Sequence, residues 1–210
     1  MQRNNGIGSG PVIAAEGRNA DSPKWINHKY GISARVYKIP SFIDFEASGL
    51  GPRSYPIEVA WSGADGGVEE CWLIRPEATY GWPLEEAWEA SAERVHGIPF
   101  EDLLRHGRSA DWIAARMNAQ LAGRTVYADG GAYDKVWCEQ LFTAAGLEMA
   151  FRIDDYWELL LTLLPPARTR RFGWQAALQE AAWKRVSGRR HRADTDVRYL
   201  VALYRLATDN

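Results

Sequence analysis

The sequence predicts an α/β domain built on one mixed sheet of five strands, with helices around it. Three short runs typical of strands follow one another closely in the first part of the chain, and helical patterns then alternate with two further short strands. The chain has 210 residues, of which 46% are hydrophobic, so it can bury one substantial core. We therefore expect one domain over residues 36–208, with its first three strands antiparallel.

Residues 1–35 are expected to precede this domain as a disordered extension. They are rich in Gly, Asn and Ser and show no sustained periodicity. The first residues lack the apolar core of a signal peptide, and apolar runs such as Leu159–Leu164 are far shorter than the roughly 20 residues that span a bilayer. Cys71 and Cys138 form neither a disulfide framework nor a zinc-binding spacing, which fits a reducing compartment. These observations indicate a cytoplasmic protein with no membrane partner.

The three early strands are predicted to form an antiparallel meander. They cover residues 34–46, 55–62 and 69–75. A turn rich in glycine separates the first two, and Pro76 ends the third. Because the runs are so closely spaced, neighbouring strands are expected to pair with each other.

The rest of the domain is predicted to alternate between helices and strands. Residues 83–95 carry apolar side chains at helical spacing and end at His96-Gly97, which indicates a helix that stops at a glycine. Further helices are predicted at residues 102–106, 111–121, 133–145, 156–164, 174–182 and 195–207, and further strands at residues 125–129 and 149–153.

Two carboxylates stand two residues apart in the first strand. Successive side chains of a strand point to opposite faces, so Asp44 and Glu46 share one face while Phe45 points to the core. Like charges held side by side are unfavourable unless a cation lies between them, and Mg²⁺ and Mn²⁺ are usual partners of carboxylate oxygens. The pair indicates a catalytic metal site, although a strand with one solvated acidic face is the plainer alternative for an isolated D-x-E.

Acids and a histidine later in the chain are further candidates for the same site. Asp134 lies in the first turn of a predicted helix, where it either complements the helix dipole or serves a site. His191 precedes the last predicted helix, and Asp196 lies in the first turn of that helix. Asp194 is expected to be its N-cap, with the helix starting at Thr195.

With these residues in this order, the chain resembles the DEDDh 3′–5′ exonucleases, which include polymerase proofreading subunits, ribonuclease T and oligoribonuclease. The family motif D-x-E-T/S-T/S-G-L corresponds to residues 44–50, N-A-x-F-D to residues 130–134, and H-x-A-x-x-D to residues 191–196. An H-G-I segment stands at residues 96–98. The resemblance covers roughly residues 37–207 and implies a ribonuclease H-like fold.

The resemblance also implies an activity and a set of site residues. The activity is hydrolysis of phosphodiester bonds at single-stranded DNA or RNA 3′ ends, with two Mg²⁺ or Mn²⁺ ions. The metal ligands would be Asp44, Glu46, Asp134 and Asp196, the general base would be His191, and the contacts to the last base and sugar would be Leu50, His96 and Ile98.

The chain departs from the family pattern at several positions. Ala47 replaces the usual hydroxyl residue, and Gly130-Gly131 replaces the asparagine of the second motif, which is expected to affect contacts to the nucleotide rather than the chemistry. Asp129 is an additional acid that either competes as a ligand or stays solvated. Asp134 is preferred because it has the family spacing and follows the aromatic Tyr133.

The charge distribution limits how the chain can hold nucleic acid. A net charge of −2 and a pI of about 6.1 argue against binding through a broad basic surface. Arg189, Arg190 and Arg192 surround His191, so they are expected to steer phosphates. The tryptophans Trp61, Trp72, Trp82 and Trp88 are expected in the core or at a groove rim rather than as base platforms.

Two other functions stay open from the sequence. One is a nuclease-like binding module with weak or no turnover, although no metal ligand is missing. The other is a metal phosphohydrolase acting on free nucleotides. The choice between DNA and RNA depends on contacts to a 2′-hydroxyl that spacing does not reveal, and a homodimer is compatible with the resemblance because some relatives are dimers.

Overall fold

The structure, a computed structural model, describes residues 39–208. The predicted extension over residues 1–35 lies outside this part, as does the beginning of the predicted first strand at residues 34–38. No helix in the described range is long and apolar enough to cross a membrane.

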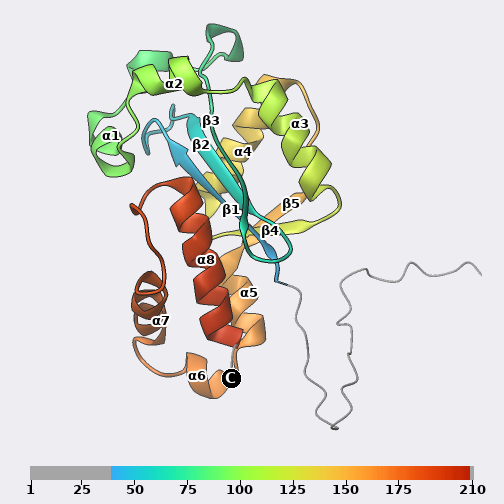
Figure 1. Cartoon of the computed structure of the whole chain (residues 1–210), viewed down its shortest axis with the longest axis vertical. Coiled ribbons are helices and arrows are strands. Elements are labelled where there is room, and N and C mark those ends of the chain that lie inside the picture. Colours follow the sequence, from blue (N-terminus) through green and yellow to red (C-terminus); the bar gives the residue numbers. More distant parts are fainter. Residues whose placement is uncertain (1–38, 209–210) are drawn as a thin grey trace, which may run out of the picture. The chain divides into compact units, whose positions relative to one another are not determined.

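Five strands form one mixed sheet in the order β3-β2-β1-β4-β5 (Figure 1). The strands are β1 (Ser41–Ala47), β2 (Pro56–Ser62), β3 (Val68–Leu73), β4 (Thr125–Ala128) and β5 (Arg152–Asp155). The first three pair antiparallel, whereas β4 is parallel to both β1 and β5. The predicted mixed sheet with an antiparallel start is therefore confirmed.

The two faces of β1 bury different parts of the core. Ile43 and Phe45 belong to a cluster with residues of α3 (Ala110–Leu121) and α4 (Ala132–Ala145). Phe42 points the other way, into a cluster with residues of α8 (Ala193–Thr208). Because side chains alternate along a strand, Asp44 and Glu46 share the face of Phe42, and Figure 1 shows α8 running along that side of the sheet.

The remaining helices complete the described part of the chain. They are η1 (Ala78–Tyr80), η2 (Leu84–Ala87), α1 (Ala90–His96), α2 (Phe100–His106), α5 (Tyr156–Leu163), α6 (Pro166–Thr169) and α7 (Trp174–Trp183). The predictions at residues 102–106, 111–121, 133–145, 156–164 and 174–182 are confirmed with small shifts of their ends.

The single helix predicted at residues 83–95 is wrong, because the chain forms the short η2 and then α1. Glu89 lies between them with an extended backbone. Its N–H donates to the carbonyl of Ser48 at 2.8 Å, and its Oε1 accepts from the N–H of Gly51 at 3.1 Å. These contacts to the turn after β1 hold Glu89 in an extended conformation, so the single helix that the apolar spacing predicts is interrupted there.

The fifth strand begins at Arg152 rather than near Met149. The N–H of Ala150 donates to the side chain of Asn118 at 2.8 Å, and its carbonyl accepts from the N–H of Gly123 at 2.8 Å. The backbone just before β5 is therefore bonded to the end of α3 and the turn after it, so pairing with β4 starts only at Arg152.

The last helix starts at Ala193, two residues earlier than predicted, so Asp194 is not its N-cap. Asp194 lies inside the first turn and forms an ion pair with Arg198. The N–H of Ala193 is instead accepted by the carboxylate of Glu58 on β2, at 2.9 Å. A side chain distant in sequence thus takes the role that a local cap was expected to have.

Candidate metal centre

Asp44 and Glu46 lie on the face of β1 that is turned toward α8. Asp44 is 9% exposed, and within the described part of the chain its Oδ2 is buried and accepts no hydrogen bond. The register of β1 and β2 shifts by one residue directly after Glu46, because Ala47 pairs with Pro56 and Ile57 is skipped. Irregular pairing of this kind bends the strands and changes the direction of side chains, and here it follows the second acid.

Asp134 is held against β1 by two backbone N–H groups. Its Oδ1 accepts from Phe45 at 3.1 Å, and its Oδ2 accepts from Gly130 at 3.0 Å. The residue is 2% exposed and lies in the first turn of α4, as predicted. A Cβ at position 130 would lie 2.3 Å from Oδ2 of Asp134, and Gly131 has a φ of 62°, so the glycine pair builds the turn that places this acid.

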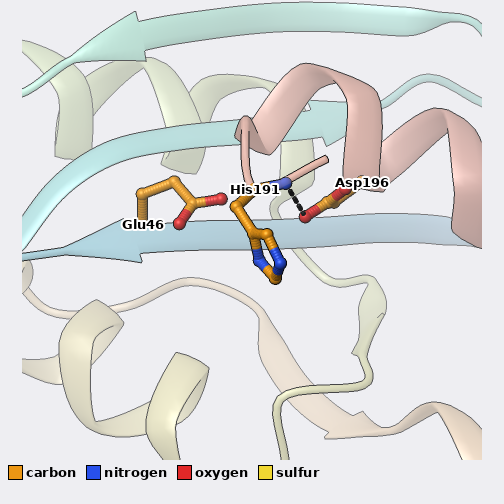
Figure 2. Close-up of side chains that lie close together, drawn as sticks. All are labelled: Glu46, His191 and Asp196. Atoms are coloured by element: carbon orange, nitrogen blue, oxygen red, sulfur yellow. Dashed lines mark hydrogen bonds between the residues drawn. The ribbon is translucent and has the colours of Figure 1, made fainter. Parts of the chain in front are cut away.

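His191 and Asp196 approach Glu46 from the start of α8 (Figure 2). One potential ligand atom from each of these three side chains lies within 4.8 Å of the other two. The N–H of His191 donates to Oδ2 of Asp196 at 3.1 Å, whereas Oδ1 of Asp196 is buried and accepts no hydrogen bond from any described residue. The backbone of His191 is left-handed, with a φ of 60°, so the segment before α8 is sharply turned.

Burial and mutual repulsion raise the pKa values of all four predicted ligands. Burial raises the pKa of Glu46 to about 8, and the charge of Asp196 adds to this effect. Burial likewise raises the pKa of Asp134 and of Asp196 to about 7 each. For Asp44, burial and then the charges of Asp134 and Glu46 raise the pKa well above its ordinary value. The four carboxylates are therefore close enough to destabilise one another when all are ionised.

Asp129 is a fifth acid within reach of this group. Burial raises its own pKa to about 6, and its charge contributes to the raised pKa values of Asp44, Asp134 and Asp196. The family spacing favours Asp134 over Asp129 as the ligand. The structure brings both acids near the site, and only Asp134 has the two backbone donors that fix its carboxylate.

The donor set fits a hard divalent cation. Carboxylate oxygens are the preferred ligands of Mg²⁺ and Mn²⁺, and an imidazole can complete a Mn²⁺ site. The buried oxygens of Asp44 and Asp196 that accept no hydrogen bond from the described residues would gain a partner in such an ion. A cation would also offset the repulsion that raises the pKa values of these acids.

The three predicted substrate contacts differ in exposure. Leu50, in the turn after β1, is 67% exposed, whereas His96 and Ile98 are 2% and 3% exposed. Nδ1 of His96 accepts from the N–H of Ile98 at 3.0 Å, and burial lowers the pKa of His96 to about 4, so its ring is neutral. Of the three, Leu50 alone offers free apolar surface, and the substrate role of all three stays a prediction.

The arginines around His191 have partners within the protein. Arg189 donates to the carbonyls at the end of α1, and Arg190 lies over the ring of Trp183 with 4.2 Å to its centroid. Arg192 pairs with Glu58. Arg190 nevertheless lowers the pKa of Asp196, so its charge reaches the site, and phosphate steering stays a prediction.

The four tryptophans singled out above lie in the core or pack against it, as expected. Trp61 is fully buried, and Trp72 and Trp82 lie against the same core cluster. Trp88 packs edge-on against Phe100.

No family model matches the sequence, and a search of curated proteins found no match either. Solved structures do match. Escherichia coli exonuclease I with a dT13 oligonucleotide superimposes with a TM-score of 0.59 over 81% of this chain, at 15% identity. A zinc ion bound complex of the same enzyme with single-stranded DNA gives 0.57 over 79% of this chain, at 17% identity. The chain has the fold of exonuclease I.

A third structure supports the same fold. Exonuclease I from Methylocaldum szegediense gives a TM-score of 0.55 over 79% of this chain, at 17% identity. The chain spans only 39–41% of the length of these exonuclease I chains. The ribonuclease H-like fold implied by the resemblance to DEDDh exonucleases is thus confirmed, and at such identities the likeness concerns the fold alone.

Proposed function

We propose that the protein is a metal-dependent 3′–5′ exonuclease that removes nucleotides from single-stranded nucleic acid ends. The observation that carries the proposal is that buried and half-buried carboxylates from β1, α4 and α8 lie together near His191. Buried oxygens of Asp44 and Asp196 that accept no hydrogen bond from the described residues support a role in holding cations rather than in stabilising the fold. The exonuclease I fold supports the same activity by analogy.

In this proposal the side chains have separate roles. Asp44, Glu46, Asp134 and Asp196 would hold two Mg²⁺ or Mn²⁺ ions. When bound, such ions would help to activate the attacking water and would stabilise the charge on the leaving 3′-oxygen. His191 takes the proton from that water, a task suited to a side chain whose ordinary pKa lies near neutrality. A new P–O bond forms to the water oxygen, the P–O3′ bond breaks, and the 3′-oxygen leaves with a proton as a hydroxyl.

The substrate is proposed to be a flexible single strand. The matched exonuclease I structures include complexes with single-stranded oligonucleotides. Leu50 is exposed at the turn after β1 and offers an apolar surface for the terminal base, and contact with a base face tolerates any sequence. Both DNA and RNA ends are included in the proposal, and whether the protein acts as a homodimer is left to measurement.

The test is hydrolysis of oligonucleotides labelled at the 5′ end, with Mg²⁺, with Mn²⁺ and with EDTA. We expect a ladder that shortens one nucleotide at a time from the 3′ end, only with a divalent ion, and no reaction when the 3′ end is blocked. Matched DNA and RNA oligonucleotides of several lengths would define the sugar preference. Asp154→Asn, which removes an exposed acid on β5, should cleave like the wild type.

Three results would contradict the proposal. Internal fragments would indicate an endonuclease. Hydrolysis of nucleoside triphosphates without cleavage of oligonucleotides would indicate a phosphohydrolase of free nucleotides. Tight binding of single strands without turnover would indicate a nuclease-like binding module.

A further inference from the structure

We propose that Glu58 and Arg192 are positioning residues, whose two-point contact between guanidinium and carboxylate holds the segment from His191 to Asp196 in place against Glu46. The inference rests on the proposed function, because it assigns these two residues to the same site. Neither residue belongs to the set that the motifs assign to the chemistry. Their role follows from the contacts that join β2 to the start of α8.

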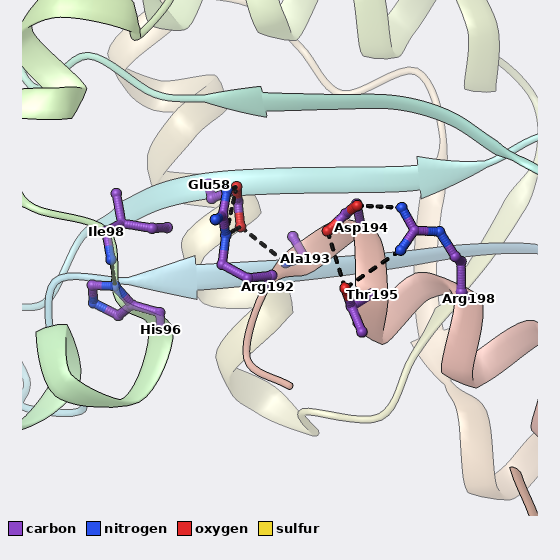
Figure 3. A network of polar contacts seen from close by, with 8 residues as sticks. All are labelled: Glu58, His96, Ile98, Arg192, Ala193, Asp194, Thr195 and Arg198. Carbon is purple, nitrogen blue, oxygen red and sulfur yellow. Dashed lines mark hydrogen bonds and ion pairs between the residues drawn. The ribbon is translucent and has the colours of Figure 1, made fainter. Parts of the chain in front are cut away.

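The carboxylate of Glu58 accepts hydrogen bonds from Arg192, just before α8, and from Ala193, the first residue of α8 (Figure 3). Nη2 of Arg192 donates to its Oε1 at 2.6 Å, and Nε of Arg192 donates to its Oε2 at 3.1 Å. The N–H of Ala193 donates to the same Oε2 at 2.9 Å. The side chain of Glu58 is 1% exposed, so a guanidinium fork and a backbone amide meet on one buried carboxylate.

This contact lies beside the candidate metal centre. Glu58 is the direct partner of Glu46 in the antiparallel register of β1 and β2, so both side chains point to the face covered by α8. Two ionised acids directly opposite each other destabilise a sheet. Arg192 supplies the compensating positive charge from the helix side, so the start of α8 and the acidic strand pair depend on each other.

The contact of Arg192 with Glu58 affects both His191 and Asp196, because Arg192 lies between them in the chain. It directly follows His191, and its own carbonyl accepts the N–H of Asp196 at 3.0 Å. Anchoring Arg192 on β2 therefore fixes the backbone on both sides, with His191 before it and the first turn of α8 after it. On the other side of His191, Arg189 is tied to the carbonyls of Arg94 and Val95 at 2.9 and 3.1 Å. His191 is thus held between two anchored neighbours.

The same helix offers a matched comparison. Asp194 and Arg198 also form an ion pair, but it lies within the first turns of α8, and their side chains are 30% and 43% exposed. Exposed pairs of this kind contribute little, whereas removing Arg192, itself 36% exposed, leaves the buried carboxylate of Glu58 without its ion-pair partner. Arg198→Gln therefore removes an arginine charge six residues further along the chain, inside α8, without breaking the link between Arg192 and the sheet.

The experiment compares R192Q, E58Q, the double variant and R198Q in the full chain. Affinity for Mn²⁺ is measured by calorimetry, and cleavage is resolved into kcat and KM. We expect R192Q and E58Q each to bind Mn²⁺ roughly 10–100-fold more weakly and to lose kcat more than KM, as when groups that orient metal ligands are removed. The double variant should be no worse than the poorer single variant, because the two residues act as one unit. R198Q should stay within about twofold of wild type.

A second measurement separates positioning from general loss of folding. Hydrogen exchange of the amides at residues 189–196 in metal-free protein should speed up in R192Q but not in R198Q, while the amides of β4 and α4 stay protected. R192K keeps the charge but cannot form the two-point fork, so it should keep more stability than R192Q and recover little of the Mn²⁺ affinity. All assays are run well below the melting temperature of each variant.

The outcomes distinguish the two proposals. Active wild-type protein whose R192Q and E58Q variants bind Mn²⁺ and cleave like R198Q would overturn the positioning role and leave the exonuclease intact. Full recovery of metal affinity and kcat in R192K would likewise overturn it, since charge alone would then suffice. Wild-type protein that binds Mn²⁺ without cleaving any strand would overturn the exonuclease, while the affinities of the variants would still decide the positioning role. Wild-type protein that does neither would overturn both.

Discussion

The carboxylate of Asp134 accepts the backbone N–H of Phe45, 3.1 Å away, although the two residues are 89 positions apart in the sequence. Phe45 stands between Asp44 and Glu46, so this bond ties the first turn of α4 to the middle of the acidic strand segment. A carboxylate with one donor on each oxygen keeps further lone pairs for a cation. The bond therefore sets the place of Asp134 without excluding it as a ligand.

Removing Asp44 should abolish metal-dependent cleavage and stabilise the metal-free protein. Its carboxylate lies among like charges and has a buried oxygen without a donor among the described residues, so Asp44→Asn relieves repulsion while keeping the shape. We expect turnover to fall by at least about 100-fold and the urea midpoint in EDTA to rise. Asp44→Ala should also lose cleavage and keep its fold. Near-wild-type turnover in either variant would remove Asp44 from the mechanism.

The stability of the metal-free protein should fall as the pH rises from about 5 to about 8. In the unfolded chain these acids lose their protons near pH 4, whereas in the folded protein Glu46 has a pKa of about 8 and Asp134 and Asp196 have pKa values of about 7. The folded state thus holds more protons across this window, and each extra proton lowers the stability by about 1.4 kcal/mol per pH unit.

Urea unfolding in EDTA at pH 5.5, 7 and 8.5 would measure this effect. Because other groups also titrate, the informative quantity is the stability of Asp44→Asn minus that of wild type, which should grow with pH. Saturating Mn²⁺ should remove the loss of stability with rising pH in the wild type, because bound cations stabilise the ionised acids. A difference that stays constant or shrinks as the pH rises would show that the acids do not repel one another as the structure indicates.

Replacing His191 should reduce turnover and leave metal affinity largely intact. Its imidazole lies beside Glu46 and Asp196, but the proposed mechanism uses it as the base and not as a ligand. For His191→Ala we expect kcat to fall roughly 10²–10⁴-fold, in the range typical of general-base catalysis. A calorimetric titration with Mn²⁺ is the check, and loss of binding there would make His191 a ligand instead.

Asp134 and Asp129 can be separated by paired substitutions. Asp134→Asn removes a carboxylate fixed by two backbone donors, so it should lose most of the Mn²⁺ affinity and the turnover. Asp129→Asn removes a nearby charge that lacks this fixation, so we expect turnover within about tenfold of wild type, the size of a modest electrostatic effect. Steady-state cleavage of one labelled oligonucleotide by both variants decides the assignment. The reverse order of losses would move the ligand to Asp129.

Local patterns predicted most elements because they decide which face of a segment is apolar. The meander, the last strands and the long helices follow from period-2 and period-3.6 spacing of apolar side chains. The failures occurred where a distant group took over a backbone bond. Glu89 has an extended backbone because its N–H bonds to the carbonyl of Ser48. At the start of α8, Glu58 rather than Asp194 accepts the N–H of Ala193.

The sequence by itself determined the class of fold and the order of the candidate ligands, because strand alternation puts Asp44 and Glu46 on one face and short motifs carry the remaining acids. Only the tertiary structure decided which groups surround them. It set Glu58 opposite Glu46, brought Asp129 within range of the same charges, and buried His96 and Ile98 while leaving Leu50 exposed. These relations depend on strand register and on the packing of α8 against the sheet, and both are set by contacts between residues far apart in the chain.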